Sequence, residues 1–262
     1  TIEWLDHDSP ETGLMEKTSG EELFRVEHLQ KQFPKNDNVL GDLFNGGNVQ
    51  VVHAIEDISF VAHEGETIAV VGESGCGKST LGNILMGFEA ATSGKVHFND
   101  ADLRRTQVDT HELGLRQKIQ MIFQNPFDAL NPSFSVGRQI ARVVRKFSGE
   151  REKGKIQARV LELLDQVKLP REILRRKPHQ LSGGQKRRSG IVRAFVGKAC
   201  LVIADDRTSA LGVSVQSAII ELLLDIQRTH GTTLLFISHD LSVVRYIADR
   251  VIVMYLGHIV EQ

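Results

Sequence analysis

Short apolar runs alternate with amphipathic stretches over much of the chain. Five runs rich in β-branched residues stand out, at Thr67–Val71, Ile119–Phe123, Leu201–Ala204, Thr233–Ile237 and Val251–Met254. Runs of this kind are typical of buried strands. Helical spacing of apolar residues predicts helices over Ser79–Phe88, a segment ending at Phe195, Val213–Gln227 and Leu241–Tyr246. This alternation predicts an α/β fold in which helices connect parallel strands.

Two other regions have different patterns. Toward the N-terminus, period-two alternation predicts strands at Leu23–Leu29, Ala54–Ala62 and Lys95–Phe98, while Lys35–Asn48 has the Asn, Asp and Gly content of a loop. The middle of the chain, about 124–190, is largely helical from Val136 to Leu169 and looks inserted into the strand–helix series. Thr1–Gly20 is polar and acidic and has no clear periodicity, so it is either a tail or a docking arm.

Composition narrows the functional classes. The 262 residues are 41% hydrophobic and 25% charged, as in ordinary globular domains, and the net charge of −1 gives no general attraction to nucleic acid. No apolar run has the length needed to cross a bilayer, and Thr1–Glu16 is not a secretory signal. The two cysteines, Cys76 and Cys200, form no disulfide framework and suit a reducing cytoplasm.

A glycine-rich loop follows the first buried run. Gly72-Glu73-Ser74-Gly75-Cys76-Gly77-Lys78-Ser79 fits the pattern G-x-x-x-x-G-K-[ST] between a predicted strand and a predicted helix. In such a loop, backbone N–H groups surround phosphate oxygens and the helix N-terminus adds partial positive charge. Lys78 is then expected to reach the β- and γ-phosphates, and the Ser79 hydroxyl to ligate Mg²⁺. The alternative is a chance glycine turn. Cys76 occupies a position at which the pattern allows any residue, and it is expected to be a small side chain that fits there rather than a catalytic thiol.

Three polar residues stand at or just after the ends of predicted strands. Asp205 ends the run from Leu201, Gln124 follows Phe123, and His239 follows the run Thr233–Ile237. Ligands of open α/β sheets bind at the carboxyl ends of the strands. Asp205 is therefore expected in the Mg²⁺ shell. A lone histidine more often serves packing or solvent contact, and the chain has ten histidines. His239 is therefore a candidate site residue only because it follows the end of a predicted strand.

A pentapeptide, Leu181-Ser182-Gly183-Gly184-Gln185, lies between the glycine loop and the strand that ends in Asp205 and Asp206. The three features in this order resemble the ATP-binding subunits of ABC transporters. The phrases Gln120–Pro126, Leu130–Pro132, Ser238–Leu241 and Val253–Gly257 are most similar to those of oligopeptide and dipeptide importers. The resemblance covers about residues 23–262.

The resemblance implies a fold and a division of the chain. The fold is an α/β P-loop NTPase (RecA-like) parallel-sheet core with an antiparallel β subdomain and an inserted α-helical subdomain. Residues 1–20 would be a tail, 21–262 the nucleotide-binding domain, and about 125–190 the helical subdomain. Relatives often carry a C-terminal extension with cysteines, which the sequence lacks, so no iron–sulfur site is expected.

The same resemblance assigns ATP and Mg²⁺ as cofactors and gives each motif a role. Asp206, His239, Gln124 and Lys78 would be catalytic, and Ser79, Gln124 and Asp205 would hold the metal. ATP would contact a larger set: Phe33, Gly72, Ser74, Gly75, Cys76, Gly77, Lys78, Ser79, Thr80, Ser182, Gly183, Gly184 and Gln185. Phe33 is the candidate for stacking on adenine. Phe44 is the second candidate, and loop packing is the alternative for both.

The resemblance also implies partners. The pentapeptide of one subunit binds the γ-phosphate held by another, so a second ABC ATPase subunit, different from this one, is expected. Transmembrane permease subunits and, indirectly, a solute-binding protein outside the membrane would complete a peptide importer, with no nucleic acid. The chain would lie peripherally on the cytoplasmic face of the membrane. A soluble ABC ATPase and an ATP-sensing regulatory subunit are the alternatives, and the exposure of Asn125–Gly137 toward a membrane subunit distinguishes them.

Three positions depart from the family pattern. Asp206 stands where the family has a glutamate that polarises the attacking water, Arg207 replaces a proline and Gly212 an aspartate. The shorter side chain of Asp206 places its carboxylate about 1.5 Å short. A misplacement of this size lowers a rate by about 100-fold. The subunit is therefore expected to hydrolyse ATP poorly at its own site, unless backbone adjustment repositions Asp206.

Overall fold

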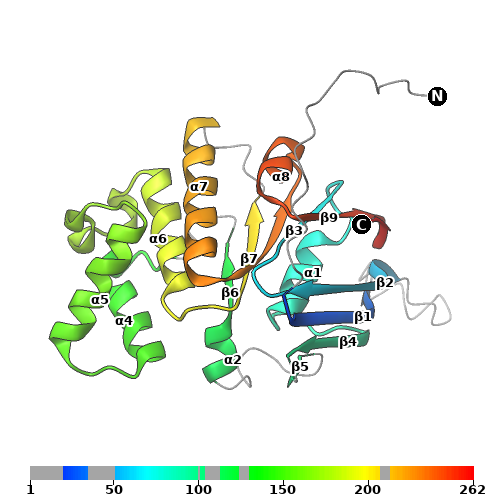
Figure 1. The fold of residues 1–262 in the computed structure, drawn as a ribbon, viewed down its shortest axis with the longest axis horizontal. Coiled ribbons are helices and arrows are strands. Elements are labelled where there is room, and N and C mark those ends of the chain that lie inside the picture. Colours follow the sequence, from blue (N-terminus) through cyan, green and yellow to red (C-terminus); the bar gives the residue numbers. More distant parts are fainter. Residues whose placement is uncertain (1–19, 35–50, 100, 104–112, 124–129, 207–212) are drawn as a thin grey trace, which may run out of the picture.

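The computed structural model describes residues 20–34, 51–99, 101–103, 113–123, 130–206 and 213–262. The larger of its two sheets has the strand order β10-β9-β3-β8-β7-β6 (Figure 1). Its strands are β3 (Thr67–Gly72), β6 (Ile119–Ile122), β7 (Leu201–Asp206), β8 (Thr233–Ser238), β9 (Arg250–Tyr255) and β10 (His258–Glu261). All neighbours are parallel except β9 and β10. The five predicted runs and the α/β fold class are thereby confirmed.

Both faces of this sheet are buried. Successive side chains of a strand point to opposite faces, so Ile203 and Leu235 join one core cluster while Val202 and Leu234 join another. The helix α1 (Lys78–Leu85) covers the first face, and α6 (Gly183–Phe195) and α7 (Val213–His230) cover the second. Burial on two sides explains why these strands are continuously apolar rather than alternating.

The second sheet is antiparallel and has the order β2-β1-β4-β5. Its strands are β1 (Glu22–Pro34), β2 (Val51–His63), β4 (Ser93–Phe98) and β5 (Ala101–Asp102), and the first two are longer than the alternation predicts. Between the pairs Lys31↔Ile55 and Gln32↔His53 the register shifts by one residue, which leaves Ala54 as a bulge in β2. Leu81 and Leu85 of α1 are packed between the two sheets.

The helical region between β6 and β7 contains α4 (Val136–Ser148), α5 (Lys153–Gln166), the 3-10 turns Arg171–Arg175 and Pro178–Gln180, and α6. The prediction that Val136 to Leu169 is largely helical is confirmed, with one break: α4 ends before Gly149, whose φ is 66°, and α5 starts at Lys153. Glycine takes this left-handed conformation without steric cost. In Figure 1, α4, α5 and α6 lie on one side of α7 and the antiparallel sheet lies on the other.

Further elements complete the fold. α2 (Leu113–Lys118) and β10 have no counterpart in the sequence prediction, and α8 (Leu241–Ile247) follows β8 as predicted. No described helix combines the length and apolar character that a membrane crossing requires. Residues 1–19 of the segment Thr1–Gly20, predicted as a tail or a docking arm, and the loop predicted at Lys35–Asn48 lie outside the described residues.

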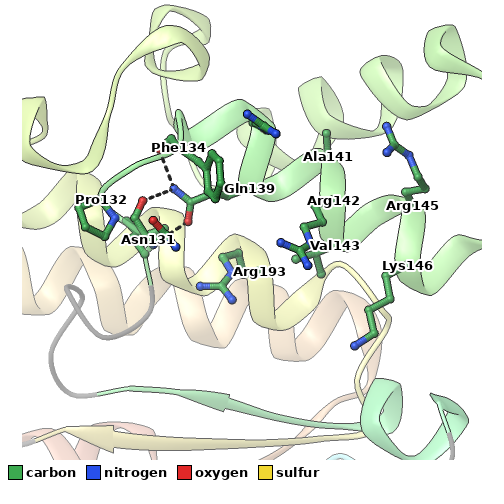
Figure 2. Close-up of a pocket in the computed structure, with 12 residues that line it drawn as sticks. Asn131, Pro132, Phe134, Gln139, Ala141, Arg142, Val143, Arg145, Lys146 and Arg193 are labelled. Carbon is green, nitrogen blue, oxygen red and sulfur yellow. Dashed lines mark hydrogen bonds between the residues drawn. The ribbon is translucent and has the colours of Figure 1, made fainter.

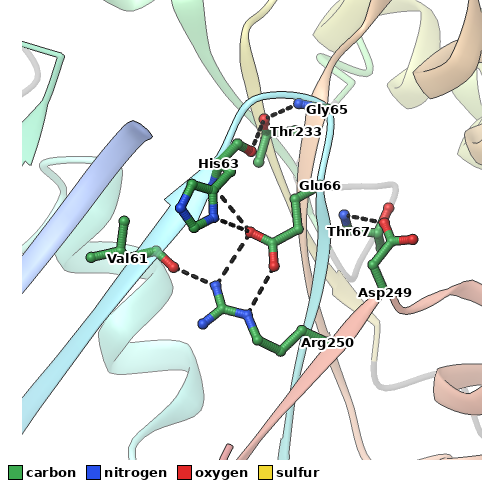
Figure 3. Close-up of polar contacts among 8 residues, drawn as sticks. All are labelled: Val61, His63, Gly65, Glu66, Thr67, Thr233, Asp249 and Arg250. Atoms are coloured by element: carbon green, nitrogen blue, oxygen red, sulfur yellow. Dashed lines mark hydrogen bonds and ion pairs between the residues drawn. The ribbon is translucent and has the colours of Figure 1, made fainter. Parts of the chain in front are cut away.

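Arg250, at the start of β9, connects the two sheets beside the start of β3 (Figure 3). Arg250 Nε donates to Glu66 Oε1 at 2.8 Å and Arg250 Nη2 donates to Glu66 Oε2 at 3.2 Å. The same Nη2 donates to the carbonyl of Val61 in β2. A bidentate contact of this kind fixes direction as well as distance. Because the ion pair orients the Arg250 guanidinium, the bond from this group to Val61 fixes the position of β2 relative to β3, the strand that leads into the glycine loop.

Candidate functional site

The glycine loop connects the C-terminal end of β3 to the start of α1. Gly77 is the N-cap of α1 with φ 106°, a conformation that favours glycine. A Cβ atom at Gly77 would lie 2.3 Å from the carbonyl oxygen of Ala54. The bulge in β2 therefore carries a carbonyl directly against the loop, and the last glycine before the helix has a steric reason as well as a conformational one.

A second backbone contact holds the loop from another side. Gly257, in the turn between β9 and β10, donates its N–H to the carbonyl of Cys76 at 3.2 Å. The carbonyl of Gly257 in turn accepts from the N–H of Glu56 in β2 at 2.8 Å. The loop is thus fixed by β2 and by the β9–β10 turn. Sequence reasoning missed this junction because backbone atoms carry it and no side-chain type marks it.

Lys78 is buried, with 7% of its surface exposed. Its Nζ donates to the carbonyls of Gly72 and Glu73, at 2.7 Å each, and lies 3.5 Å from Cys76 Sγ. A buried ammonium needs such partners because an unpaired charge in the interior is strongly destabilising. The contacts hold the cation over the loop, where phosphate oxygens can replace the carbonyls as its partners.

Ser79 and Asp205 meet across the end of the sheet. The Ser79 hydroxyl donates to Asp205 Oδ2 at 3.2 Å, and Asp205 is buried with 8% exposed. A hydroxyl beside a carboxylate at the mouth of a phosphate loop offers the oxygen ligands that Mg²⁺ prefers. The residues present therefore fit the metal that the sequence predicts there.

A cavity of about 350 Å³ opens beside the loop. Its lining combines the loop, the first residues of α1 and the end of β8: Ser74, Gly75, Gly77, Lys78, Ser79, Thr80, Ile237, Ser238 and His239. The structure therefore brings His239 to the same space as the loop residues. Ile237 and Ser238 were not predicted in the site, although their place just before His239 would have indicated them.

The position of Asp206 follows from sheet register. In β7 and β8, Asp205 pairs with Ile237 and Asp206 with Ser238, so the backbone of Asp206 lies one residue from His239. Its side chain lies outside the described residues, as do Gln124, Phe44 and 207–212, which include Arg207 and Gly212.

Phe33 does not line the cavity. It lies in β1 opposite Val52, two residues from Ala54 in β2, so the β2 strand connects it to the contact with Gly77. The Nζ of Lys31 lies 4.6 Å from the centroid of the Phe33 ring. The ring is half-buried and stands at the edge of the site rather than inside the phosphate-binding part.

The pentapeptide lies apart from the cavity, at the start of α6. Ser182 is the N-cap: its Oγ accepts from the N–H of Gln185 at 3.3 Å, and its N–H donates to Gln185 Oε1 at 3.1 Å. This capping box fixes the first turn of the helix. Ser182 and Gly183 are exposed, so this helix N-terminus faces outward, as binding to a nucleotide on another subunit would require.

A larger cavity, of about 930 Å³, lies among the helices between β6 and β7 (Figure 2). Its described lining contains no acidic residue and includes five basic side chains, those of Arg138, Arg142, Arg145, Lys146 and Arg193. Burial lowers the pKa of Arg193 from its ordinary value, and its buried Nε has no hydrogen-bond partner among the described residues. Asn131 and Phe134 form the other end, held by Gln139, whose Nε2 donates to both of their carbonyls.

Known proteins resemble this chain in sequence and in fold. Residues 55–209 match the family described as ABC transporter. The chain is 44% identical to the probable peptide ABC transporter ATP-binding protein y4tS of Sinorhizobium fredii, over 91% of this chain and 66% of that protein. It is 40% identical to the oligopeptide transport ATP-binding protein OppF of Bacillus subtilis, over 92% of this chain and 75% of that protein. The chain spans between about two thirds and three quarters of the length of these two curated relatives.

A solved structure gives the same fold. The ATP-binding cassette MJ0796, in a dimeric post-hydrolysis state bound to ADP and Pi, superposes with a TM-score of 0.77 at 25% identity. The match covers 91% of this chain and 97% of that one.

Proposed function

We propose that this chain, which belongs to the ABC transporter family, is the ATP-binding subunit of a peptide importer and couples ATP hydrolysis to transport. The observation that carries the proposal is the cavity in which Lys78, Ser79 and His239 meet, with Asp205 bonded to Ser79. The names of the relatives supply the solute class, since they are ATP-binding proteins for peptide or oligopeptide transport.

The residues of the cavity divide the chemistry among them. Phosphoryl transfer needs mainly positioning and charge stabilisation, which the loop N–H groups and Lys78 provide. Ser79 and Asp205 would hold Mg²⁺, which neutralises phosphate charge when bound. Asp206 would orient the attacking water, and His239, at the end of β8, would contact the γ-phosphate. Gln124 would report the state of the site to the helices that follow it.

We further propose that hydrolysis at this site is weak. Asp206 has a shorter reach than the glutamate that it replaces, and a general base acts only within hydrogen-bonding distance of the water. The exposed Ser182 end of α6 would complete the competent site of a different ATPase subunit. ATP bound at the weak site would then hold the two subunits together.

The basic cavity is the proposed contact with the permease, at the cytoplasmic face of the membrane. Its five cations, which include Arg193 with its buried Nε, favour a segment that carries carboxylates, because a buried guanidinium gains most from a charged partner. Pro132 and Phe134 lie at its edge, within the stretch Asn125–Gly137 that is expected to face a membrane subunit. Exchange of Arg142 for Glu is expected to release the permease without affecting ATP affinity.

Binding of Mg·ATP by the purified chain tests the first part. Lys78→Ala is expected to weaken binding by at least about tenfold, since a charge-assisted phosphate contact contributes about 1.5–3 kcal/mol. The exposed Lys95 provides the matched control, Lys95→Ala, which should bind as the wild type does. Equal affinity of the Lys78 and Lys95 variants would contradict the proposed site.

ATP turnover of the assembled transporter tests the second part. Asp206→Glu is expected to raise turnover or leave it unchanged, while loss of the corresponding acid in the partner ATPase abolishes it. If Asp206→Ala stops turnover as completely as the partner change does, both sites hydrolyse ATP and the asymmetric arrangement is wrong.

The solute class is tested with the transporter in liposomes, where peptides should stimulate ATP turnover and free amino acids should not.

A further inference from the structure

Lys31 is a buried cation in β1, beyond the part of this strand that the sequence pattern predicts. Only 8% of it is exposed. Its Nζ donates to Glu89 Oε1 at 2.5 Å and to the carbonyl of Ala90 at 2.8 Å. A buried ammonium is retained only where such partners compensate its lost hydration. The two contacts therefore fix the position of Nζ.

The fixed ammonium faces an aromatic ring. Phe33 lies two residues further along β1, on the same side of the strand, and Nζ is 4.6 Å from its ring centroid. This distance is within the range of a favourable cation–π contact. Lys31 thereby occupies one face of the ring and restricts its rotation.

The partner of Lys31 belongs to the connection that follows α1, the helix of the phosphate loop. The N–H of Glu89 donates to the carbonyl of Asn83 in α1 at 3.2 Å. Two further bonds join this connection to β1: Thr92 N–H to the Gln30 carbonyl at 2.9 Å, and Gln32 N–H to Thr92 Oγ1 at 3.0 Å. Through Glu89, the ring of Phe33 is positioned relative to the helix that begins with Lys78 and Ser79.

We propose that Lys31 is a positioning residue that holds Phe33 as the platform on which the adenine base of ATP stacks. The proposal rests on the proposed function, because it assumes that the cavity beside the loop binds ATP. The ammonium draws negative charge from one ring face, so the other face becomes a better partner for an electron-rich purine. The Lys31–Glu89 pair also sets the separation between base and phosphate sites.

Comparing ATP with inorganic tripolyphosphate isolates the base from the phosphates. Dissociation constants of both ligands, with Mg²⁺, are measured for the full chain and its variants. Lys31→Met keeps most of the stem but removes the charge, and it is expected to weaken ATP binding about five- to tenfold. Tripolyphosphate affinity should change by less than about twofold, within ordinary scatter for a group outside the phosphate site. Lys31→Arg should restore ATP affinity, and Lys95→Met, at an exposed lysine, should change neither ligand.

A double-mutant cycle tests whether Lys31 acts on ATP binding through Phe33. Phe33→Ala is expected to weaken ATP binding by at least as much, and in that background Lys31→Met should add almost nothing. Glu89→Gln leaves Lys31 in place but loosens it, so it should give a smaller loss for ATP alone and serves if Lys31→Met does not fold. Additive effects, equal loss of both ligands in the Lys31 variant, or no effect of Phe33→Ala would overturn the inference. A wild-type chain that binds neither ligand would instead refute the proposed function.

Discussion

Replacement of Gly77 by alanine tests how the glycine loop is held. The residue has φ 106°, and a Cβ atom there would lie 2.3 Å from the carbonyl oxygen of Ala54. That distance is about 0.7 Å short of the 3.0 Å below which Cβ contacts are essentially never seen. Relief requires movement of the loop or of β2, which is fixed by its pairing with β1 and by its bond to Gly257.

Two separate effects are expected in Gly77→Ala. Backbone strain at a positive φ contributes about 1–3 kcal/mol of destabilisation. The forced contact with Ala54 adds about 1–3 kcal/mol, as for other overpacked sites. Gly75 separates the two, because it has φ 86° but an added Cβ there meets nothing within 4 Å. Gly75→Ala should therefore show the strain alone.

Thermal unfolding of the full chain, followed by far-UV circular dichroism, measures the difference. The Tm of Gly77→Ala is expected to fall about 2–12 °C below that of Gly75→Ala, from the contact term and the usual 2–4 °C per kcal/mol. Gly154→Ala in α5, where the nearest atom to a new Cβ is 3.7 Å away, should raise Tm slightly. Equal Tm values for the Gly77 and Gly75 variants would show that β2 does not press on the loop.

Other parts of the fold give further expectations. Arg250→Ala should lower the free energy of unfolding by about 1–3 kcal/mol, and a cycle with Glu66→Gln should show that the two changes are not additive, because both remove one ion pair. Ser182→Ala should lower stability by about 1 kcal/mol through loss of the α6 cap, while Ser182→Asp retains it, as thermal melts of both will show. Burial, and then Arg159, lower the pKa of His230 in the folded chain, so His230 binds a proton more readily in the unfolded chain. The free energy of unfolding should therefore fall as the pH drops below 6.5, and a pH series of melts should show a smaller fall for His230→Gln.

The strands of the main sheet were predictable because each is buried on both faces and so forms a short, continuous apolar run. β10 has no such signature: His258 and Val260 are exposed, and only its pairing with β9 makes it a strand. The end of α4 before Gly149 had a local signal in Ser148-Gly149, but the prediction of a largely helical stretch placed no boundary there. Pairing and helix termination thus depend on contacts that residue periodicity reports weakly.

The candidate site divides in the same way. The glycine loop and His239 follow from motifs at strand ends, and the structure lines one cavity with both. The carbonyls of Ala54 and Cys76 and the N–H of Gly257 are invisible to residue type, so their junction could not be predicted. Lys31 was missed for another reason: the strand predicted at Leu23–Leu29 ends before it, and the partners that bury it come from the connection after α1.

The helix α1 links the phosphate end of the site to the residues that hold Phe33. α1 begins with Lys78 and Ser79 at the phosphate end, is packed between the two sheets along Leu81 and Leu85, and leads to the connection that holds Lys31. A displacement of α1 would therefore move the phosphate contacts and the Phe33 ring together. Because Gly77→Ala acts at one end of this helix and Lys31→Met at the other, the first should impair both tripolyphosphate and ATP binding, and the second ATP binding alone. Phosphate recognition and base recognition are then separable by mutation, although one helix, α1, positions the residues for both.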